Sequence, residues 1–472
     1  MISKLAILSF FASPTLAQVW GTQGTWEMVL PVPDSNGNLN SPNQAFWNAG
    51  FLAGNLLISA NSTTSQLGLD LYKFNIVTQT WSSPYIFTPG GTSPLVQEPF
   101  VFAYGGFAII IDESNPTVMY FIDSNAASNS SWTPITVVGN PLLLNRLGQR
   151  FLVWGSQLYM FGGYVPSSSP TTPSVQYNDL WVMGLSQAIL GNGAAWALVS
   201  PPADSTTGLV PGYPPPRIGY TWTPYQVGAI MFGGLSTSKQ GDDVFSCFRQ
   251  VTPNPDCFFH ENVWGLLPGY VNVNVVPNQM PTTAWVRLGY AGNNGGPTPT
   301  GRAFHSAGQM GNQLYVYGGF TAQGPSSELW AYDLTSQNWG LVTSSGPSPS
   351  GRGPSVVAGF HFYVYTQNFI PGQGVIPGSG QLYRWTPTLF AGGGNNNQGY
   401  NAAAMNAIAA GHTAGIVLGL LLGLANLYVL FRLAQNARVS IFDFGFGGAG
   451  KAYSLPSFTT SDMSAAYEAP SL

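Results

Sequence analysis

The chain has 472 residues, and only 7% of them are charged, which is far below the ~25% usual in globular proteins. Its 58 glycines and 37 prolines predict many turns and an uncharged polar surface. The formal net charge is −4 with only 14 basic residues, so the chain lacks the basic patch that nucleic-acid binding requires, and we expect no nucleic-acid partner.

The first 17 residues carry the pattern of a secretory signal peptide. Lys4 precedes the apolar stretch Leu5–Ala12, and Thr15-Leu16-Ala17 forms a small-residue cleavage site before Gln18. We therefore predict a signal peptide over residues 1–17 and a secreted ectodomain that begins at residue 18.

A hydrophobic run that ends in Gly-Gly recurs along the chain with a tryptophan downstream of each copy. The four copies are Phe102–Phe107, Tyr159–Tyr164, Ile230–Leu235 and Tyr315–Phe320. The runs are short, rich in Val, Tyr, Trp and Leu, and bounded by turn-forming residues, which predicts strands. A repeat of this size indicates one supersecondary unit per copy, each packed against its neighbours.

The fullest copy is Pro299–Leu341. Gly301-Arg302 opens it, a strand then ends at Gly318-Gly319, and the strand Leu329–Asp333 and Trp339 follow. This unit resembles a kelch repeat, the four-stranded blade of a β-propeller, as found also in the central domain of galactose oxidase. The resemblance implies an all-β fold over residues 18–390.

Looser copies extend the pattern to six blades. The strand Thr25–Leu30 has no blade of its own, and we expect it to complete the sixth blade, because a ring must pair its ends to avoid an exposed sheet edge. Seven blades is the alternative if Gln44–Ala60 contains an extra unit.

The C-terminal region predicts a membrane anchor. A Gly-, Asn- and Ala-rich linker over residues 391–411 leads into an apolar segment, residues 412–431, long enough to span a bilayer. Arg432 and Arg438 follow it, and flanking positive charge marks the cytosolic side. We predict a single-pass type I protein of the plasma membrane or another secretory-pathway membrane, with a disordered cytosolic tail over residues 432–472.

Two modifications follow from the predicted secretion. Cys247 and Cys257 lie in one long insertion and are expected to form a disulfide. Asn61 and Asn129 begin glycosylation sequons.

The lengths of the predicted connections point to a binding face. The connections between the second and third strands of three blades are long: Val165–Tyr177, Ser236–Glu261 and Thr366–Gly380. In a propeller these connections share one face, and long insertions on one face of a repeat fold commonly mark its binding surface.

Four arginines occupy what the sequence indicates to be one place in four blades, near this long-loop face: Arg150, Arg217, Arg302 and Arg352. They are our candidate binding residues, since guanidinium groups hold carboxylates or sugars. The alternative is that they satisfy neighbouring backbone carbonyls.

The first functional hypothesis is a non-catalytic interaction or adhesion protein of the cell surface, which binds a protein or glycan without cofactor or metal. The low charge also resembles that of fungal secreted proteins. The second hypothesis is a copper-radical oxidase of the galactose or glyoxal type, a kelch-like family that needs a Tyr–Cys cross-link. A third is a structural scaffold of cell polarity or the cell wall.

Overall fold

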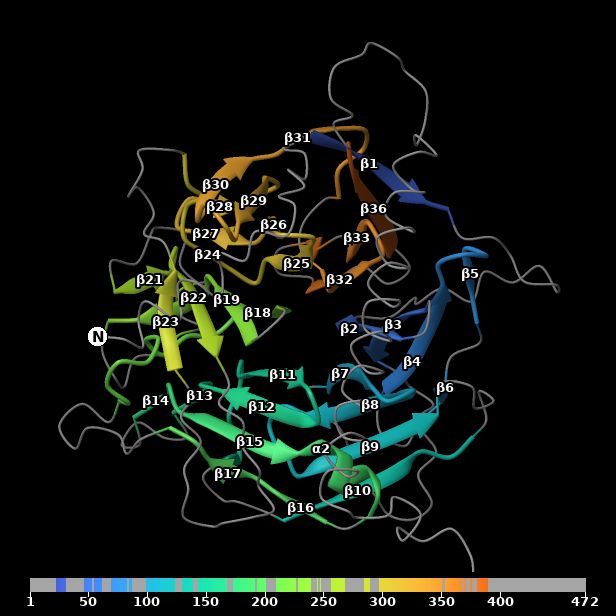
Figure 1. Ribbon diagram of the computed structural model, residues 1–472, viewed down its shortest axis with the longest axis vertical. Coiled ribbons are helices and arrows are strands. Elements are labelled where there is room, and N and C mark those ends of the chain that lie inside the picture. The colour runs from blue at the N-terminus through green and yellow to red at the C-terminus, as the bar shows by residue number, and fades with distance from the viewer. Residues whose placement is uncertain are drawn as a thin grey trace, which may run out of the picture. The chain divides into compact units, whose positions relative to one another are not determined.

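We analysed a computed structural model of the chain, shown in Figure 1. The structure describes residues 23–30, 46–52, 55–61, 69–82, 85–86, 99–123, 130–138, 143–167, 173–191, 193–200, 209–225, 228–238, 244, 247, 256–267, 284–288, 297–349, 353–366, 369–370, 374–375 and 380–388. All of them lie in one compact unit, Met1–Phe390.

The described strands form six sheets of four or five strands, numbered here in chain order. Sheet 1 contains β2 (Phe46–Leu52), β3 (Asn55–Asn61), β4 (Leu69–Asn75) and β5 (Thr80–Trp81), with β6 (Tyr85–Ile86) beside β4. Sheet 2 contains β7 (Pro99–Tyr104), β8 (Phe107–Asp112), β9 (Val118–Asp123), β10 (Thr133–Val138) and β16 (Ala194–Ala195). Sheet 3 contains β11 (Arg150–Trp154), β12 (Gln157–Phe161), β15 (Leu180–Gly184) and β17 (Ala197–Leu198).

The remaining three sheets follow the same plan. Sheet 4 contains β18 (Thr221–Tyr225), β19 (Gly228–Phe232), β22 (Val263–Leu267) and β23 (Ala284–Leu288). Sheet 5 contains β25 (Ser306–Met310), β26 (Gln313–Tyr317), β29 (Leu329–Asp333) and β30 (Asn338–Leu341). Sheet 6 contains β32 (Ser355–Ala358), β33 (His361–Thr366), β36 (Gln381–Pro387), β1 (Gln23–Val29) and β31 (Thr343–Ser345).

The innermost strands of the six sheets contact one another in a closed cycle. Strand β2 meets β7, and β11, β18, β25 and β32 follow in order until β32 meets β2 again. The sheets therefore radiate from a common centre, as Figure 1 shows, and the fold is an all-β propeller.

The N-terminal strand closes this ring. β1 pairs antiparallel with β36, so that Trp26 lies opposite Trp385. The indole of Trp26 is 1% exposed and packs on Tyr317 at a ring-centroid distance of 4.9 Å. The prediction that this strand completes the last sheet is confirmed. Residues of the segment Gln44–Ala60 form β2 and β3, the inner strands of sheet 1, and not an additional unit.

The tryptophans pack between neighbouring sheets, as aromatic residues in the core of a ring of sheets are expected to do. Trp339 of sheet 5 lies 4.8 Å from Phe232 of sheet 4, measured between ring centroids, and Trp285 of sheet 4 lies 5.1 Å from Phe161 of sheet 3. These contacts hold each sheet to the next.

Three of the four Gly-Gly copies are equivalent and one is not. Gly162-Gly163, Gly233-Gly234 and Gly318-Gly319 follow the second strand of their sheets. Gly105-Gly106 instead forms the two-residue turn between β7 and β8, with φ of 57° and 90°. A Gly-Gly pair also suits a tight hairpin turn, where both central residues take positive φ. The sequence repeat was therefore misaligned in sheet 2, where Glu113-Ser114 follows the second strand.

Several predictions fall outside the described residues. They are the signal peptide 1–17, the linker 391–411, the span 412–431, the tail 432–472, Asn129 and Arg352. Asn61 ends β3. Within the described ranges, the structure contains no helix with the length and apolar character needed to cross a bilayer.

Candidate interaction face

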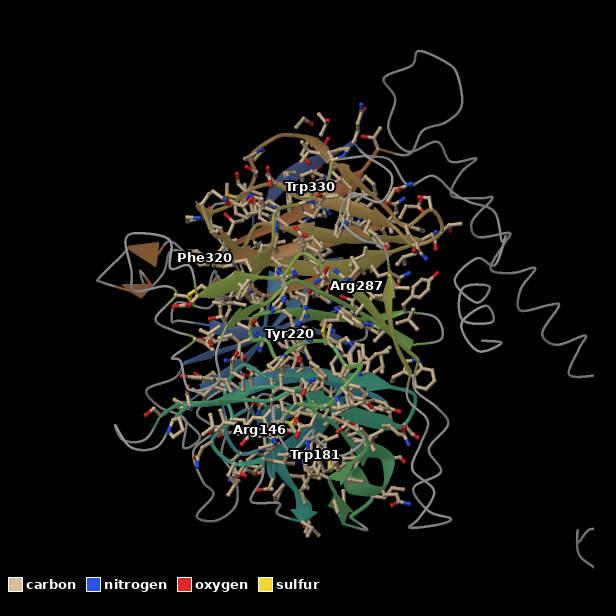
Figure 2. The ribbon with its side chains drawn as sticks, turned by 90° about the vertical axis from the view of Figure 1, so that its left-hand side faces the viewer. Arg146, Trp181, Tyr220, Arg287, Phe320 and Trp330 are labelled. Carbon is tan, nitrogen blue, oxygen red and sulfur yellow. A yellow bond between two sulfur atoms is a disulfide. The ribbon has the colours of Figure 1, made fainter. Side chains whose placement is uncertain are left out.

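Small hairpins fill the connections between the second and third strands of four sheets. They are β13 (Tyr164–Val165) with β14 (Val175–Gln176), β20 (Leu235–Thr237) with β21 (Cys257–Phe259), β27 (Phe320–Thr321) with β28 (Gly324–Pro325), and β34 (Phe369–Ile370) with β35 (Gly374–Val375). In the edge-on view of Figure 2, Phe320 and the orange strands β34 and β35 lie on the left-hand side. The described parts of these connections thus form hairpins on one face, which we call the long-loop face. By contrast, one connection between third and fourth strands holds a short helix, α2 (Leu185–Ile189).

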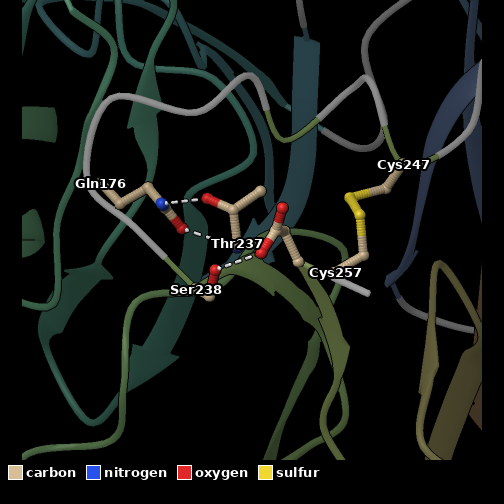
Figure 3. The surroundings of a disulfide bond; sticks show 6 residues. Gln176, Thr237, Ser238, Cys247 and Cys257 are labelled. Atoms are coloured by element: carbon tan, nitrogen blue, oxygen red, sulfur yellow. Dashed lines mark hydrogen bonds between the residues drawn. A yellow bond between two sulfur atoms is a disulfide. The ribbon is translucent and has the colours of Figure 1, made fainter. Parts of the chain in front are cut away.

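The β20–β21 hairpin is joined to its neighbours by covalent and polar links, as Figure 3 shows. Cys257 in β21 forms a disulfide with Cys247, which confirms the predicted bond. Gln176 of β14 donates from Nε2 to Oγ1 of Thr237 in β20 at 2.6 Å. Ser238 donates to the Asp256 carboxylate at 3.1 Å across the base of the loop. The hairpins of sheets 3 and 4 therefore support each other.

Three buried arginines share one geometry on this face. Nη1 of Arg146, Arg217 and Arg302 donates to the carbonyl oxygen of Gly162, Gly233 and Gly318, at 3.1, 2.8 and 3.1 Å. The residue after each arginine pairs with the residue after each Gly-Gly, as in Ala303 with Phe320. The arginines thus tie the segment that enters each sheet to the end of its second strand.

Arg150 does not belong to this set. It lies at the start of β11, four residues beyond Arg146, and its Nη1 lies 2.7 Å from Oε1 of Glu113, which directly follows β8 of sheet 2. The sequence placed Arg150 with Arg217 and Arg302, and this placement was wrong, because Arg146 makes the equivalent bond. Counting back 16 residues from the first glycine of each pair would have found Arg146.

The arginine set bonds to backbone carbonyls, which was the structural alternative raised from the sequence. Arg217 and Arg302 are 1% and 0% exposed. Burial, with a smaller contribution from the charge of Arg287, lowers the pKa of Arg217 to about 9. A ligand-binding role for these arginines stays a prediction.

The residue three positions after each arginine reaches into the preceding sheet. Nε2 of Gln149 donates to the carbonyl oxygen of Glu113, and the Tyr220 hydroxyl donates to that of Phe161 at 2.8 Å. Nε2 of His305 lies 2.8 Å from Oγ1 of Thr221. Burial, more than the nearby charges of Arg302 and Arg150, lowers the pKa of His305 to about 3. These bonds could not be predicted from the sequence, since Gln, Tyr and His share no motif.

The chemistry that a copper-radical oxidase needs is not assembled here. The disulfide occupies both cysteines of the chain, so no thiol is left for a Tyr–Cys cross-link. His260 is held by Ser236 at 2.8 Å and His305 by Thr221. Among the described residues, no cluster of three or more His, Cys, Asp and Glu side chains could hold a metal.

Comparisons with known proteins agree with a kelch repeat. Residues 301–344 match the family model for the Kelch motif. The chain is similar to Host cell factor 1 of Homo sapiens, with 26% identity over 53% of this chain and 11% of that protein. It is also similar to Host cell factor of Drosophila melanogaster, with 22% identity over 53% of this chain and 14% of that protein. The chain therefore spans only a small part of these relatives.

Among solved structures, one described as "Structure of YjhT" aligns with a TM-score of 0.39 and 13% identity, over 59% of this chain and 75% of that chain. Residues 301–344 therefore match a Kelch motif within one sheet of a β-propeller.

Proposed function

We propose that this protein is a non-catalytic interaction protein whose long-loop face binds a protein partner. The observation that carries the proposal is the set of four hairpins that the second-to-third connections build on one face. One of them is stapled by the Cys247–Cys257 disulfide and presents Phe258 with 52% of its surface exposed. Exposed aromatic side chains are common anchors of protein interfaces. We take the six sheets as the blades of the propeller.

The proposed location is the surface of the cell. It rests on the predicted signal peptide 1–17 and on the apolar segment 412–431 with its flanking arginines. Digestion of intact cells with an external protease tests it. The ectodomain should be cut while the tail, residues 432–472, stays protected, and a protected ectodomain would contradict the proposal.

Partner capture tests the binding face directly. The full-length chain would carry a proximity-labelling enzyme inserted between residues 17 and 18, on the same side of the membrane as the propeller, as wild type, Phe258→Ser and Val77→Ser. Val77 is 83% exposed in the turn between β4 and β5, which belongs to the opposite face, and it provides the matched control. We expect proteins enriched by wild type and Val77→Ser to be lost with Phe258→Ser. The reverse pattern would rule out the long-loop face. A glycan ligand, the other partner class that the sequence indicates, stays a prediction.

A further inference from the structure

The three equivalent arginines differ in one respect, which is how their second guanidinium nitrogen is satisfied. Nη2 of Arg146 lies 2.9 Å from Oδ2 of Asp179, and Nη2 of Arg302 lies 2.9 Å from Oε2 of Glu328. Both acids occupy the same position, directly before the third strand of their sheets. Each buried guanidinium in these two repeats therefore has a carboxylate partner.

The repeat of Arg217 lacks this carboxylate. The residue before its third strand β22 is Asn262, whose Oδ1 accepts a hydrogen bond from Nη2 of Arg287 at 2.5 Å. Nη2 of Arg217 is buried and has no hydrogen-bond partner among the described residues. A buried charge without a counter-charge is unfavourable, because nothing replaces the water that the guanidinium lost.

The acids beside Arg146 and Arg302 reach the protein surface even though the arginines do not. The side chain of Asp179 is 16% exposed and that of Glu328 is 48% exposed, while their arginines are 1% and 0% exposed. A carboxylate in this place thus covers the guanidinium and faces solvent on its other side. Beside Arg217 this place is held by the half-buried Asn262, so an external carboxylate would reach Nη2 where the Asn262 amide moves aside.

The surroundings of Arg217 favour an acidic peptide. Arg287 is exposed and adds positive charge, and its field acts on Arg217. Arg217 packs along Gly234, directly before the β20–β21 hairpin, which carries the exposed Phe258. A charged nitrogen and an exposed aromatic side chain in the same repeat fit a partner segment that combines an acidic and an apolar side chain.

We propose that Arg217 binds the carboxylate of an acidic side chain on a partner protein, in the place that Asp179 and Glu328 fill in the neighbouring repeats. This inference rests on the proposed function and specifies the chemistry of its partner. The carboxylate accepts from Nη2 and supplies the counter-charge that Asn262 lacks.

The test is thermal unfolding of the full-length chain with capped peptides. Acetyl-Gly-Glu-Gly-amide is the probe, and acetyl-Gly-Gln-Gly-amide at equal ionic strength is its uncharged control. We expect the Glu peptide at tens of millimolar to raise the Tm of the wild type by about 1–2 °C and the Gln peptide to leave it unchanged.

Two variants control the position. Asn262→Asp supplies the carboxylate from the chain itself. The Tm of this variant should therefore rise without peptide, and its response to the Glu peptide should disappear. Glu328→Gln removes the carboxylate beside Arg302, which then resembles Arg217. The Tm of this variant should therefore respond to the Glu peptide more strongly than that of the wild type.

Each other outcome overturns the inference. Equal responses to both peptides in the wild type and in Glu328→Gln would exclude carboxylate recognition. A response in Glu328→Gln alone would show that Arg217 is satisfied in another way. A shift produced by acetate but not by the Glu peptide would assign the place to a small free carboxylate. Loss of labelled partners with Phe258→Ser is measured independently, so failure of one test leaves the other standing.

Discussion

The guanidinium of Arg302 and the carboxylate of Glu328 meet at 2.9 Å, although the arginine is fully buried and the glutamate is half exposed. Hydrogen bonds from Trp330 and Arg302 lower the pKa of Glu328, while burial lowers that of Arg302. The arginine also donates to the carbonyl oxygens of Thr300 and Gly318. Glu328 therefore covers an arginine that mainly donates hydrogen bonds to backbone carbonyl oxygens.

This arrangement predicts unequal effects for the two partners. Arg302→Ala should lower the free energy of unfolding by about 2–3 kcal/mol, because buried carbonyl oxygens lose their donor. Glu328→Gln should cost less than about 1 kcal/mol, because half-exposed ion pairs are screened by solvent. Urea denaturation measures both values, and a Glu328→Gln cost equal to that of Arg302→Ala would contradict the assignment.

Removal of the Trp26 indole, which packs where the ring closes, should destabilise the protein strongly. Trp26→Ala should lower the free energy of unfolding by about 3–5 kcal/mol, since it leaves a cavity beside Tyr317 and Phe362. Met28 lies on the same strand with 41% of its surface exposed, and Met28→Ala should cost below about 1 kcal/mol. Equal costs in a denaturant titration would mean that β1 contributes little through its buried face.

Loss of the disulfide should act locally. The double substitution Cys247→Ser and Cys257→Ser removes the staple of the β20–β21 hairpin but touches none of the six sheets. Hydrogen exchange should become faster in β20 and β21, while strands such as β19 and β26 keep their protection. Uniform loss of protection across all sheets would show that the hairpin is needed for the whole propeller.

Acid should destabilise the protein through its buried histidines. The pKa of His305 falls from 6.5 to about 3 on folding, and that of His260 also lies well below 6.5, in both cases mainly through burial. Between these pH values the unfolded chain binds more protons, so the free energy of unfolding decreases as the pH falls. The steepest slope is about 1.4 kcal/mol per pH unit for each histidine.

The variant His305→Asn isolates one part of this effect, because asparagine can still bond to Thr221 but does not titrate. Its free energy of unfolding, measured from pH 7 to pH 4, should fall less steeply than that of the wild type. Parallel curves of the free energy of unfolding against pH would show that His305 takes up its proton in the folded protein as readily as in the unfolded chain.

Two glycines with similar backbone angles should respond differently to alanine. Gly105 has φ of 57° and no atom within 4 Å of an added Cβ, so Gly105→Ala should cost only the backbone strain, about 1 kcal/mol. At Gly233, with φ of 71°, an added Cβ would lie 2.5 Å from the Arg302 oxygen and from His305. Gly233→Ala should therefore cost clearly more in the same denaturation assay, and equal costs would exclude a tight contact there.

The sequence alone determined the repeat and the closure of the ring. Short runs rich in Val, Tyr, Trp and Leu, such as Tyr315–Tyr317 and Leu329–Asp333, predicted strands, and the resemblance to a kelch repeat predicted the four-stranded unit. The unpaired strand around Trp26 predicted its own place in the last sheet. The strands are local patterns of side chains. The closure of the ring follows because an unpaired sheet edge is avoided by pairing it with another strand. The disulfide was also predictable, since both cysteines lie in one connection.

Only the tertiary structure decided which arginine and which Gly-Gly pair are equivalent. Arg146 lies shortly before β11 and Arg150 is its first residue, and the two arginines make different hydrogen bonds. Gly105-Gly106 has the same residues as the other pairs, yet it forms a turn between the first and second strands. Likewise, the missing partner of Arg217 appears only when its guanidinium is compared in space with those of Arg146 and Arg302. The physical reason is that a hydrogen bond forms only at a short distance between donor and acceptor. That distance is set when the chain folds, and it cannot be read from the residue types in the sequence.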